Sequence, residues 1–176
     1  MPELETSSGP LGAGLSQAVG MALAERIDKG RASDKFFYCL LGDGELDCGQ
    51  IWEAMMLAGK EKLHNVIGIV DRNNIQIDGF TEDIMPLENL RDKWESFNWH
   101  VEEIDGHNMA RIVDACEEAK AVYEKPTVII AHTIPGRGVR EIEFDYRWHG
   151  TPPGKGPTDK IPADKQAEVF LKELRT

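Results

Sequence analysis

Two short, uninterrupted apolar runs constrain the fold of this chain more than any other feature. Residues 36–41 (FFYCLL) and residues 66–70 (VIGIV) each have the length of a strand and contain no charged side chain. Such runs are typical of strands that are covered on both faces, as in a parallel sheet. A stretch with helical spacing of apolar residues, at about 49–61, lies between them. The sequence therefore predicts a strand–helix–strand unit.

The same alternation continues along the chain. Helical spacing recurs at about 14–29, 87–97 and 112–123, whereas 101–104 and 127–133 have the composition of further strands. Residues 151–162 contain four prolines and two glycines, which predicts an irregular loop, and residues 163–173 predict a terminal helix. At 176 residues we expect one domain over 1–176, a three-layer α/β sandwich around a mostly parallel sheet.

Charge and hydropathy exclude several classes of partner. The formal net charge is −11, whereas nucleic acids and anionic membranes attract clustered Lys and Arg. No apolar run approaches the roughly 20 residues that span a bilayer, and the first residues lack the pattern of a secretion signal. We therefore expect a cytoplasmic protein without nucleic-acid or membrane partners. The three cysteines have no zinc-type spacing, and Cys39 and Cys116 fit packing positions.

Small polar turns follow the first two apolar runs. A Gly-Asp-Gly turn centred on Asp43 follows the first run, and an Asn-Asn pair that begins at Asn73 follows the second. Parallel strands end at the same edge of a sheet, so both side chains could reach one Mg²⁺, with the main-chain oxygen of Ile75 as a third ligand. Gly44 allows close approach of a phosphate to the backbone. Each turn is common by itself; the pair at this spacing indicates a metal-bridged diphosphate.

These turns and the segments around them resemble the transketolase family. The matching segments are Ser8–Ser16 (SGPLGAGLS), 42–46 (GDGEL), 49–54 (GQIWEA), 75–79 (IQIDG) and 148–150 (WHG). The resemblance covers nearly the whole chain. It implies the thiamine-diphosphate-binding fold in an N-terminally shortened form, with thiamine diphosphate and Mg²⁺ as cofactors. The implied reaction is the transfer of a two-carbon ketol unit between sugar phosphates in the pentose phosphate pathway.

The resemblance also implies roles for the residues of the two turns. Asp43, Asn73 and the main-chain oxygen of Ile75 would be the Mg²⁺ ligands. Gly44 would donate its N–H to the diphosphate, and Glu45 of the same turn would also bind the cofactor.

Four further residues receive roles from the resemblance. Gly9 and Leu11 belong to a turn that is similar to the one contacting the aminopyrimidine through main-chain atoms. Ile77 would pack against the cofactor rings. His149 matches the histidine that reaches the diphosphate and the substrate, which makes it both a cofactor-binding residue and the candidate catalytic residue.

The chain departs from the family pattern in two respects. Family members usually have a glutamate at the position of Cys48, at the contact between subunits. A thiol is neutral at pH 7 unless its pKa is lowered, so Cys48 removes a charge from this contact. The resemblance therefore does not carry over coupling between the two sites of a dimer, unless Glu45 or Asp47 substitutes for the glutamate. Family members also carry a further segment before the Gly9 turn, and a pyrimidine-binding domain. We therefore expect a homo- or hetero-oligomer that is active only with a companion subunit supplying that domain.

Two alternatives remain open at this point. One is another thiamine-diphosphate enzyme, such as the α-type subunit of a 2-oxo acid dehydrogenase or a deoxyxylulose-phosphate synthase; the Gly-Pro-Leu-Gly and Trp-His-Gly motifs favour transketolase. The other is a non-catalytic assembly subunit with the same fold. Cys48 supports that alternative, whereas Asp43 and Asn73 count against it because a scaffold needs no metal ligands.

Overall fold

The computed structural model of the chain describes residues 4–6, 9–157 and 161–175. Ser8, in the segment that resembles the family's Gly-Pro-Leu turn, lies outside the described residues. The chain divides into two compact units. Unit 1 is the described part of Met1–Arg72 together with Leu87–Thr133, and unit 2 is Asn73–Pro86 together with the described part of Ile134–Thr176. A single domain over 1–176 stays a prediction.

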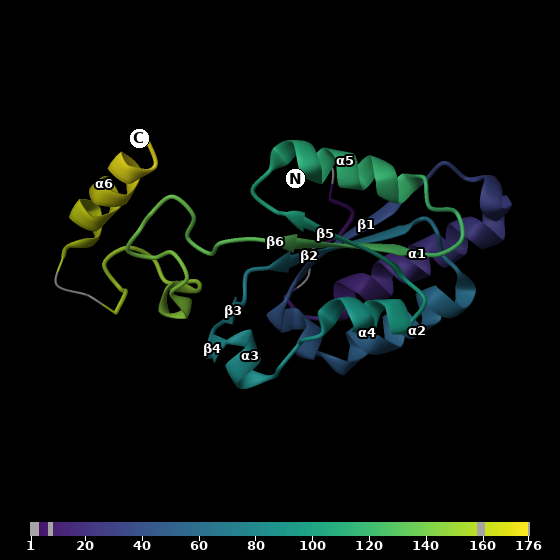
Figure 1. Cartoon of the computed structure of the whole chain (residues 1–176), viewed down its shortest axis with the longest axis horizontal. Helices are drawn as coiled ribbons and strands as arrows, with labels where there is room; N and C mark the ends of the chain where they lie inside the picture. Colours follow the sequence, from purple (N-terminus) through teal and green to yellow (C-terminus); the bar gives the residue numbers. More distant parts are fainter. Residues whose placement is uncertain (1–3, 7–8, 158–160, 176) are drawn as a thin grey trace. The chain divides into compact units, whose positions relative to one another are not determined.

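A four-stranded parallel sheet forms the centre of unit 1 (Figure 1). In spatial order its strands are β1 (Phe37–Gly42), β2 (Val66–Arg72), β6 (Thr127–His132) and β5 (His100–Asp105). Every neighbouring pair is parallel. The expected parallel sheet is therefore confirmed, and the first two apolar runs are adjacent strands. The expectation that the first run is covered on both faces is wrong, because β1 is an edge strand and its Tyr38 and Leu40 are exposed.

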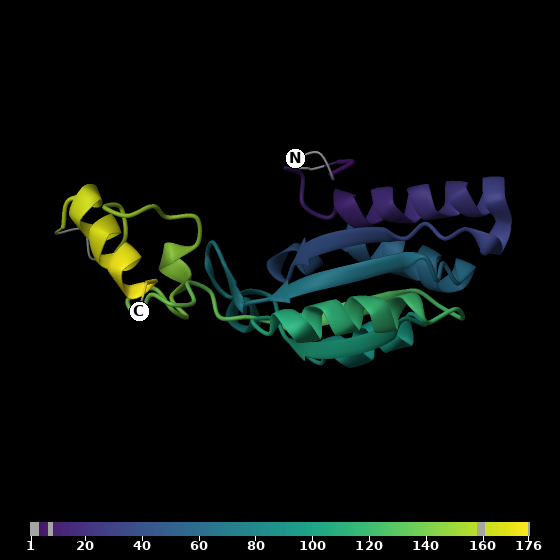
Figure 2. The ribbon, with the colours of Figure 1, turned by 90° about the horizontal axis from the view of Figure 1, so that it is seen from above.

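Helices cover both faces of this sheet (Figures 1 and 2). They are α1 (Ala13–Lys29), α2 (Gly49–Glu61) and α4 (Leu90–Ser96) on one face and α5 (Met109–Lys120) on the other. Alternate residues of β2 explain the arrangement. Val66 and Val70 join the core under α1 and α2, whereas Ile67 joins the core under α5. The continuous apolar run thus serves two cores at once, and the three-layer sandwich is confirmed.

Helix boundaries in unit 1 depend on local capping. The helix whose apolar residues recur at 112–123 begins at Met109, and Asn108 is its N-cap, as the sequence predicts: the side chain of Asn108 accepts a hydrogen bond from the N–H of Arg111 at 3.2 Å. It ends at Lys120, and Tyr123 is 64% exposed beyond it. Two short 3₁₀ helices, η1 (Gly30–Ala32) and η2 (Gly44–Asp47), are shorter than hydrophobic spacing can reveal.

Unit 2 consists of short elements and loops. They are β3 (Ile75–Gln76), β4 (Gly79–Phe80), α3 (Thr81–Ile84), η3 (Tyr146–Trp148) and α6 (Ala163–Glu173). The antiparallel β3–β4 pair is too short for alternation to predict. An aromatic contact joins the two chain segments of the unit, since the rings of Phe80 and Tyr146 lie 5.5 Å apart. Within the second segment the rings of Trp148 and Phe170 lie 5.7 Å apart. The helix α6 occupies the range expected for the terminal helix.

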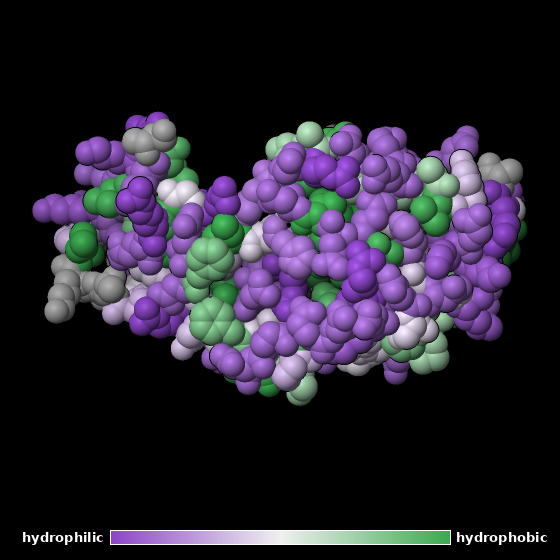
Figure 3. Space-filling model, viewed as in Figure 1, coloured by the Kyte–Doolittle hydropathy of each residue, from purple (hydrophilic) through white to green (hydrophobic). Residues whose placement is uncertain are grey.

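The visible surface of unit 1 is mainly hydrophilic (Figure 3), in keeping with the high proportion of charged residues, 29% of the chain. No helix in the described part of the chain has both the length and the apolar character needed to cross a bilayer.

Gly59 provides a test of the packing in unit 1. A Cβ atom at this position of α2 would lie 1.8 Å from the carbonyl oxygen of Phe97. We predict that Gly59→Ala lowers the free energy of unfolding by about 1–3 kcal/mol, because the backbone must move to admit the methyl group. Urea denaturation followed by Trp fluorescence measures the change.

Gly20 of α1 is the matched control, because a Cβ atom there would meet nothing within 4 Å. Gly20→Ala should raise the free energy of unfolding by roughly 0.5–1 kcal/mol, since alanine favours a helix over glycine. A Gly59→Ala protein as stable as Gly20→Ala would contradict the close packing of α2 against Phe97.

Candidate functional site

The carboxyl ends of β1 and β2 lie side by side. Gly42 is paired with Asp71, and the N–H of Asp43 donates to the carbonyl oxygen of Asp71 at 3.3 Å. Asp43 therefore leaves β1 level with Arg72, which ends β2, and Asn73 is the next residue of the chain. This is the edge at which open parallel sheets bind their ligands.

Asp43 is a buried carboxylate with defined partners. Its side chain is 1% exposed. Oδ1 accepts a hydrogen bond from the N–H of Gly44 at 2.8 Å, and Oδ2 accepts one from Nη1 of Arg72 at 3.0 Å. The Gly44 N–H, which we expected to face a diphosphate, is thus directed at the side chain of Asp43 in this structure, and Asp43 caps η2. Asp43 is held in one orientation at the start of the turn.

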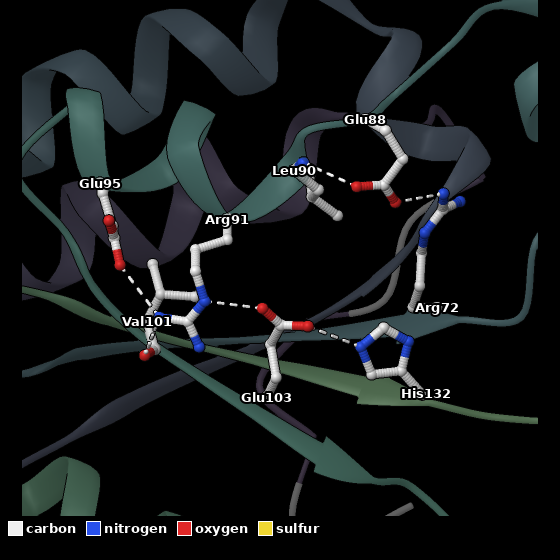
Figure 4. Close-up of polar contacts among 8 residues, drawn as sticks. All are labelled: Arg72, Glu88, Leu90, Arg91, Glu95, Val101, Glu103 and His132. Atoms are coloured by element: carbon white, nitrogen blue, oxygen red, sulfur yellow. Dashed lines mark hydrogen bonds and ion pairs between the residues drawn. The ribbon is translucent and has the colours of Figure 1, made fainter.

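Arg72 also lies at this edge, although none of the sequence motifs assigns it a role. Its side chain is 2% exposed, and Nη2 donates to Oε1 of Glu88 at 2.8 Å (Figure 4). The alternation of β2 places Arg72 on the same face as Val66 and Val70, toward the core. A buried charge has to be paired. The inward position of Arg72 in the alternation of β2 therefore indicates that Arg72 has a carboxylate partner.

Glu45 connects two segments that are distant in the sequence. Its Oε1 accepts a hydrogen bond from the N–H of Gly12 at 2.7 Å, and its Oε2 accepts one from the N–H of Gly42 at 3.1 Å. Gly12 has φ +88, and a Cβ atom there would lie 2.9 Å from the Cβ of Cys48. Only glycine fits this position without strain. Glu45 therefore fixes the Gly-Pro-Leu-Gly turn to the end of β1.

Asn73 and Ile75 belong to a compact turn of unit 2. Oδ1 of Asn73 accepts a hydrogen bond from the N–H of Ile75 at 3.0 Å, and Asn74 between them has φ +66. Ile75 is buried and pairs with Phe80 across the hairpin, whereas Ile77 lies between β3 and β4 and is 74% exposed. The amide and main-chain oxygens of this turn, like the oxygens of a carboxylate, are ligands of the kind that Mg²⁺ prefers.

The remaining predicted site residues are exposed. Gly9 and Leu11 precede α1, and the side chain of Leu11 is 62% exposed. His149 follows η3 in unit 2, and its main-chain N–H donates to the carbonyl oxygen of Tyr146 at 2.8 Å. No ligand contact tests the roles of these residues, which stay predictions.

The cysteines fit packing rather than chemistry. Burial, with a smaller effect of the Glu45 charge, raises the pKa of the Cys39 thiol to about 11, and burial also raises the pKa of Cys116. Both thiols stay protonated at neutral pH and are poor nucleophiles. Cys48 is half-buried beside Gly12.

Glu45→Gln tests the connection to the Gly12 turn. The amide group is neutral and has only one oxygen, so both backbone N–H groups lose a charged acceptor and one of them loses its acceptor altogether. We predict that hydrogen exchange at the Gly12 N–H accelerates at least about tenfold, since a hydrogen bond to a charged group contributes roughly 1.5–3 kcal/mol. Glu53→Gln, which neutralises an exposed carboxylate on α2, is the control. Equal exchange at Gly12 in both variants would contradict this role.

Comparison with known proteins identifies relatives over the whole chain. Residues 1–167 match the family model described as "Transketolase, thiamine diphosphate binding domain". The chain is 50% identical over 146 residues to the 6-deoxy-6-sulfo-D-fructose transketolase subunit SqwG of a Clostridium species, covering 83% of this chain and 52% of that protein. It is 42% identical over 174 residues to one subunit of the apulose-4-phosphate transketolase of Phocaeicola vulgatus, covering 99% of this chain and 58% of that protein.

Solved structures agree with the family model. The crystal structure of transketolase from Campylobacter jejuni aligns with a TM-score of 0.76 at 32% identity, covering 98% of this chain and 30% of that one. The chain spans about half the length of the two subunits named above. The matching fold, the matching family model and these relatives together show that the chain belongs to the transketolase family and contains its thiamine diphosphate binding domain.

Proposed function

We propose that this chain binds the diphosphate of thiamine diphosphate through Mg²⁺ and forms part of a transketolase that transfers a two-carbon ketol unit. The observation on which this depends is the buried carboxylate of Asp43 at the end of β1, level with the end of β2 from which Asn73 follows. Cytoplasmic location and a place in the pentose phosphate pathway belong to the same proposal.

Each predicted residue has a part in the proposed site. Asp43, Asn73 and the main-chain oxygen of Ile75 hold the metal, whose remaining positions are left to diphosphate oxygens and water. Gly44 presents its N–H beside the metal and the diphosphate. Glu45 acts through the backbone, because its hydrogen bonds to Gly12 and Gly42 set the two turns relative to each other.

The other residues would contact the organic part of the cofactor or the substrate. Gly9 and Leu11 offer main-chain atoms to the aminopyrimidine, and Ile77 offers an apolar side chain to the rings. His149 contacts the diphosphate and the substrate. When bound, thiamine diphosphate supplies the electron sink that C–C bond cleavage needs, while the residues of this chain bind and orient it.

The substrate we propose is a ketose with an anionic group. One relative is named for apulose 4-phosphate and another for 6-deoxy-6-sulfo-D-fructose, and both names combine a sugar with a phosphate or a sulfonate. Sugar phosphates are the first candidates, and sulfonated ketoses belong in the same substrate panel because the relative named for one is 50% identical to this chain.

The companion is proposed from the same relatives, since both are named as subunits. It would supply the pyrimidine-binding domain, in a homo- or hetero-oligomer.

Asp43→Ala tests the metal site. We predict that Mg²⁺-dependent binding of thiamine diphosphate weakens at least about tenfold, since even residues that only support metal ligands typically affect affinity 10–100-fold. Titration with cofactor and Mg²⁺, followed by Trp fluorescence, measures the affinity. Asp28→Ala on α1, which removes an exposed carboxylate, should bind like the parent chain.

Because Asp43→Ala also removes the partner of a buried arginine, Asp43→Asn is measured in parallel, and thermal unfolding confirms that each variant is folded. Parent-like affinity in both Asp43 variants would exclude Asp43 from the site. Saturable metal-dependent binding by the parent chain separates the enzyme from a non-catalytic assembly subunit.

The need for a companion is tested by reconstitution. We predict no ketol transfer by the purified chain alone and measurable transfer after it is mixed with a subunit that carries the pyrimidine-binding domain. The same mixture made with Asp43→Ala is the control, and it should stay inactive. Transfer by the purified chain alone would refute the requirement for a companion.

A further inference from the structure

Arg72 places a buried positive charge directly on a proposed metal ligand. The Arg72 and Asp43 side chains are 2% and 1% exposed, and Nη1 lies 3.0 Å from Oδ2. A guanidinium does not lose its proton in proteins, so Arg72 keeps its positive charge beside this carboxylate. The carboxylate that we assign to Mg²⁺ is therefore already neutralised by a cation that belongs to the chain.

The guanidinium of Arg72 is held at a second point. Nη2 lies 2.8 Å from Oε1 of Glu88, whose side chain is 53% exposed (Figure 4). Oε2 of Glu88 in turn accepts a hydrogen bond from the N–H of Leu90 at 3.0 Å, at the start of α4. Arg72 thus extends between a buried carboxylate and a more exposed one that is itself fixed by the backbone.

A divalent cation and the Arg72 guanidinium compete for contact with the Asp43 carboxylate. Two positive groups that share one buried carboxylate repel each other, and this repulsion is screened much less than it would be in water. A second carboxylate, on Glu88, is already in contact with the guanidinium and is open to solvent. Arg72 can therefore give up Asp43 while it keeps a charged partner.

We propose that Arg72 is a resident counter-ion of Asp43, which neutralises the carboxylate in the metal-free chain and is displaced when the metal and the diphosphate bind. Glu88 retains the guanidinium after the exchange. Metal binding then competes with the Arg72–Asp43 ion pair. This inference rests on the proposed function, since it concerns the same carboxylate, and it makes Arg72 a positioning residue that sets the affinity of the site.

Competition makes a prediction about binding that can be measured without activity. Arg72→Met removes the competing cation and retains a long side chain. We expect the variant to bind Mn²⁺, used as the probe in the presence of excess thiamine diphosphate, more tightly than the parent by roughly 5- to 150-fold, the usual range of coupling between two binding events. Loss of the EPR signal of free Mn²⁺ measures the affinity.

Arg91→Met is the matched control. Arg91 lies in the same region of unit 1 (Figure 4), where it contacts Glu95 and Glu103 at 3.0 and 2.7 Å. Its substitution removes the same charge from the chain and leaves the Arg72–Asp43 pair intact. Mn²⁺ affinity should therefore stay close to that of the parent.

The outcomes separate this inference from the proposed function. If the parent binds and Arg72→Met binds equally or less tightly, or if both Met variants gain affinity alike, competition is overturned and the proposed function stands. If none of the three proteins binds Mn²⁺ with thiamine diphosphate, the proposed function fails and the inference fails with it. Binding by Arg72→Met but not by the parent supports competition and overturns the proposed function for the parent chain.

A second measurement uses the parent chain, in case Arg72→Met does not fold without metal. In the metal-free protein both terminal nitrogens of Arg72 donate to carboxylates, so its guanidinium protons should exchange slowly with water. Adding Mg²⁺ and thiamine diphosphate to ¹⁵N-labelled protein should accelerate this exchange, because the bond to Asp43 is lost. Unchanged Arg72 signals in protein that has bound the cofactor would overturn the proposal.

Discussion

The parallel pairing of β1 with β2 is the constraint on which the candidate site depends. It sets Asp43 level with Arg72 at one edge of the sheet. The second apolar run, β2, is covered on both faces, whereas β1 is an edge strand that buries only one face. With Val66 and Val70 turned toward α1 and α2, Arg72 on the same side of β2 has to face the core. The same register that brings the proposed ligand to the edge also brings a cation to it.

The succession of helices and strands could be predicted from the sequence because each long element buries an apolar face with its own period. The strand order could not: nothing in the spacing of residues 127–132 places β6 between β2 and β5. The β3–β4 hairpin escaped prediction because two-residue strands have no measurable alternation.

The site was predictable to a similar extent. Asp43 stood out because a Gly-Asp-Gly turn follows an apolar run, and the structure buries Asp43 at that edge. The backbone-binding role of Glu45 was out of reach, since its partner Gly12 lies 33 residues away and hydrogen bonds of this kind leave no periodic trace. The ion pair of Arg72 with Asp43 was equally hidden, although the alternation of β2 already placed a charge on the core face. An inward-facing charge at the end of a buried strand is thus a signal to search for its counter-charge.

A structure of the chain with thiamine diphosphate and Mn²⁺ tests the central claim most directly, because anomalous scattering locates the metal independently of the protein. The account predicts a single metal peak at coordination distance from the side-chain oxygens of Asp43 and Asn73, with the diphosphate bound to the same ion. A metal and diphosphate bound away from Asp43, with the carboxylate still on Arg72, would contradict it.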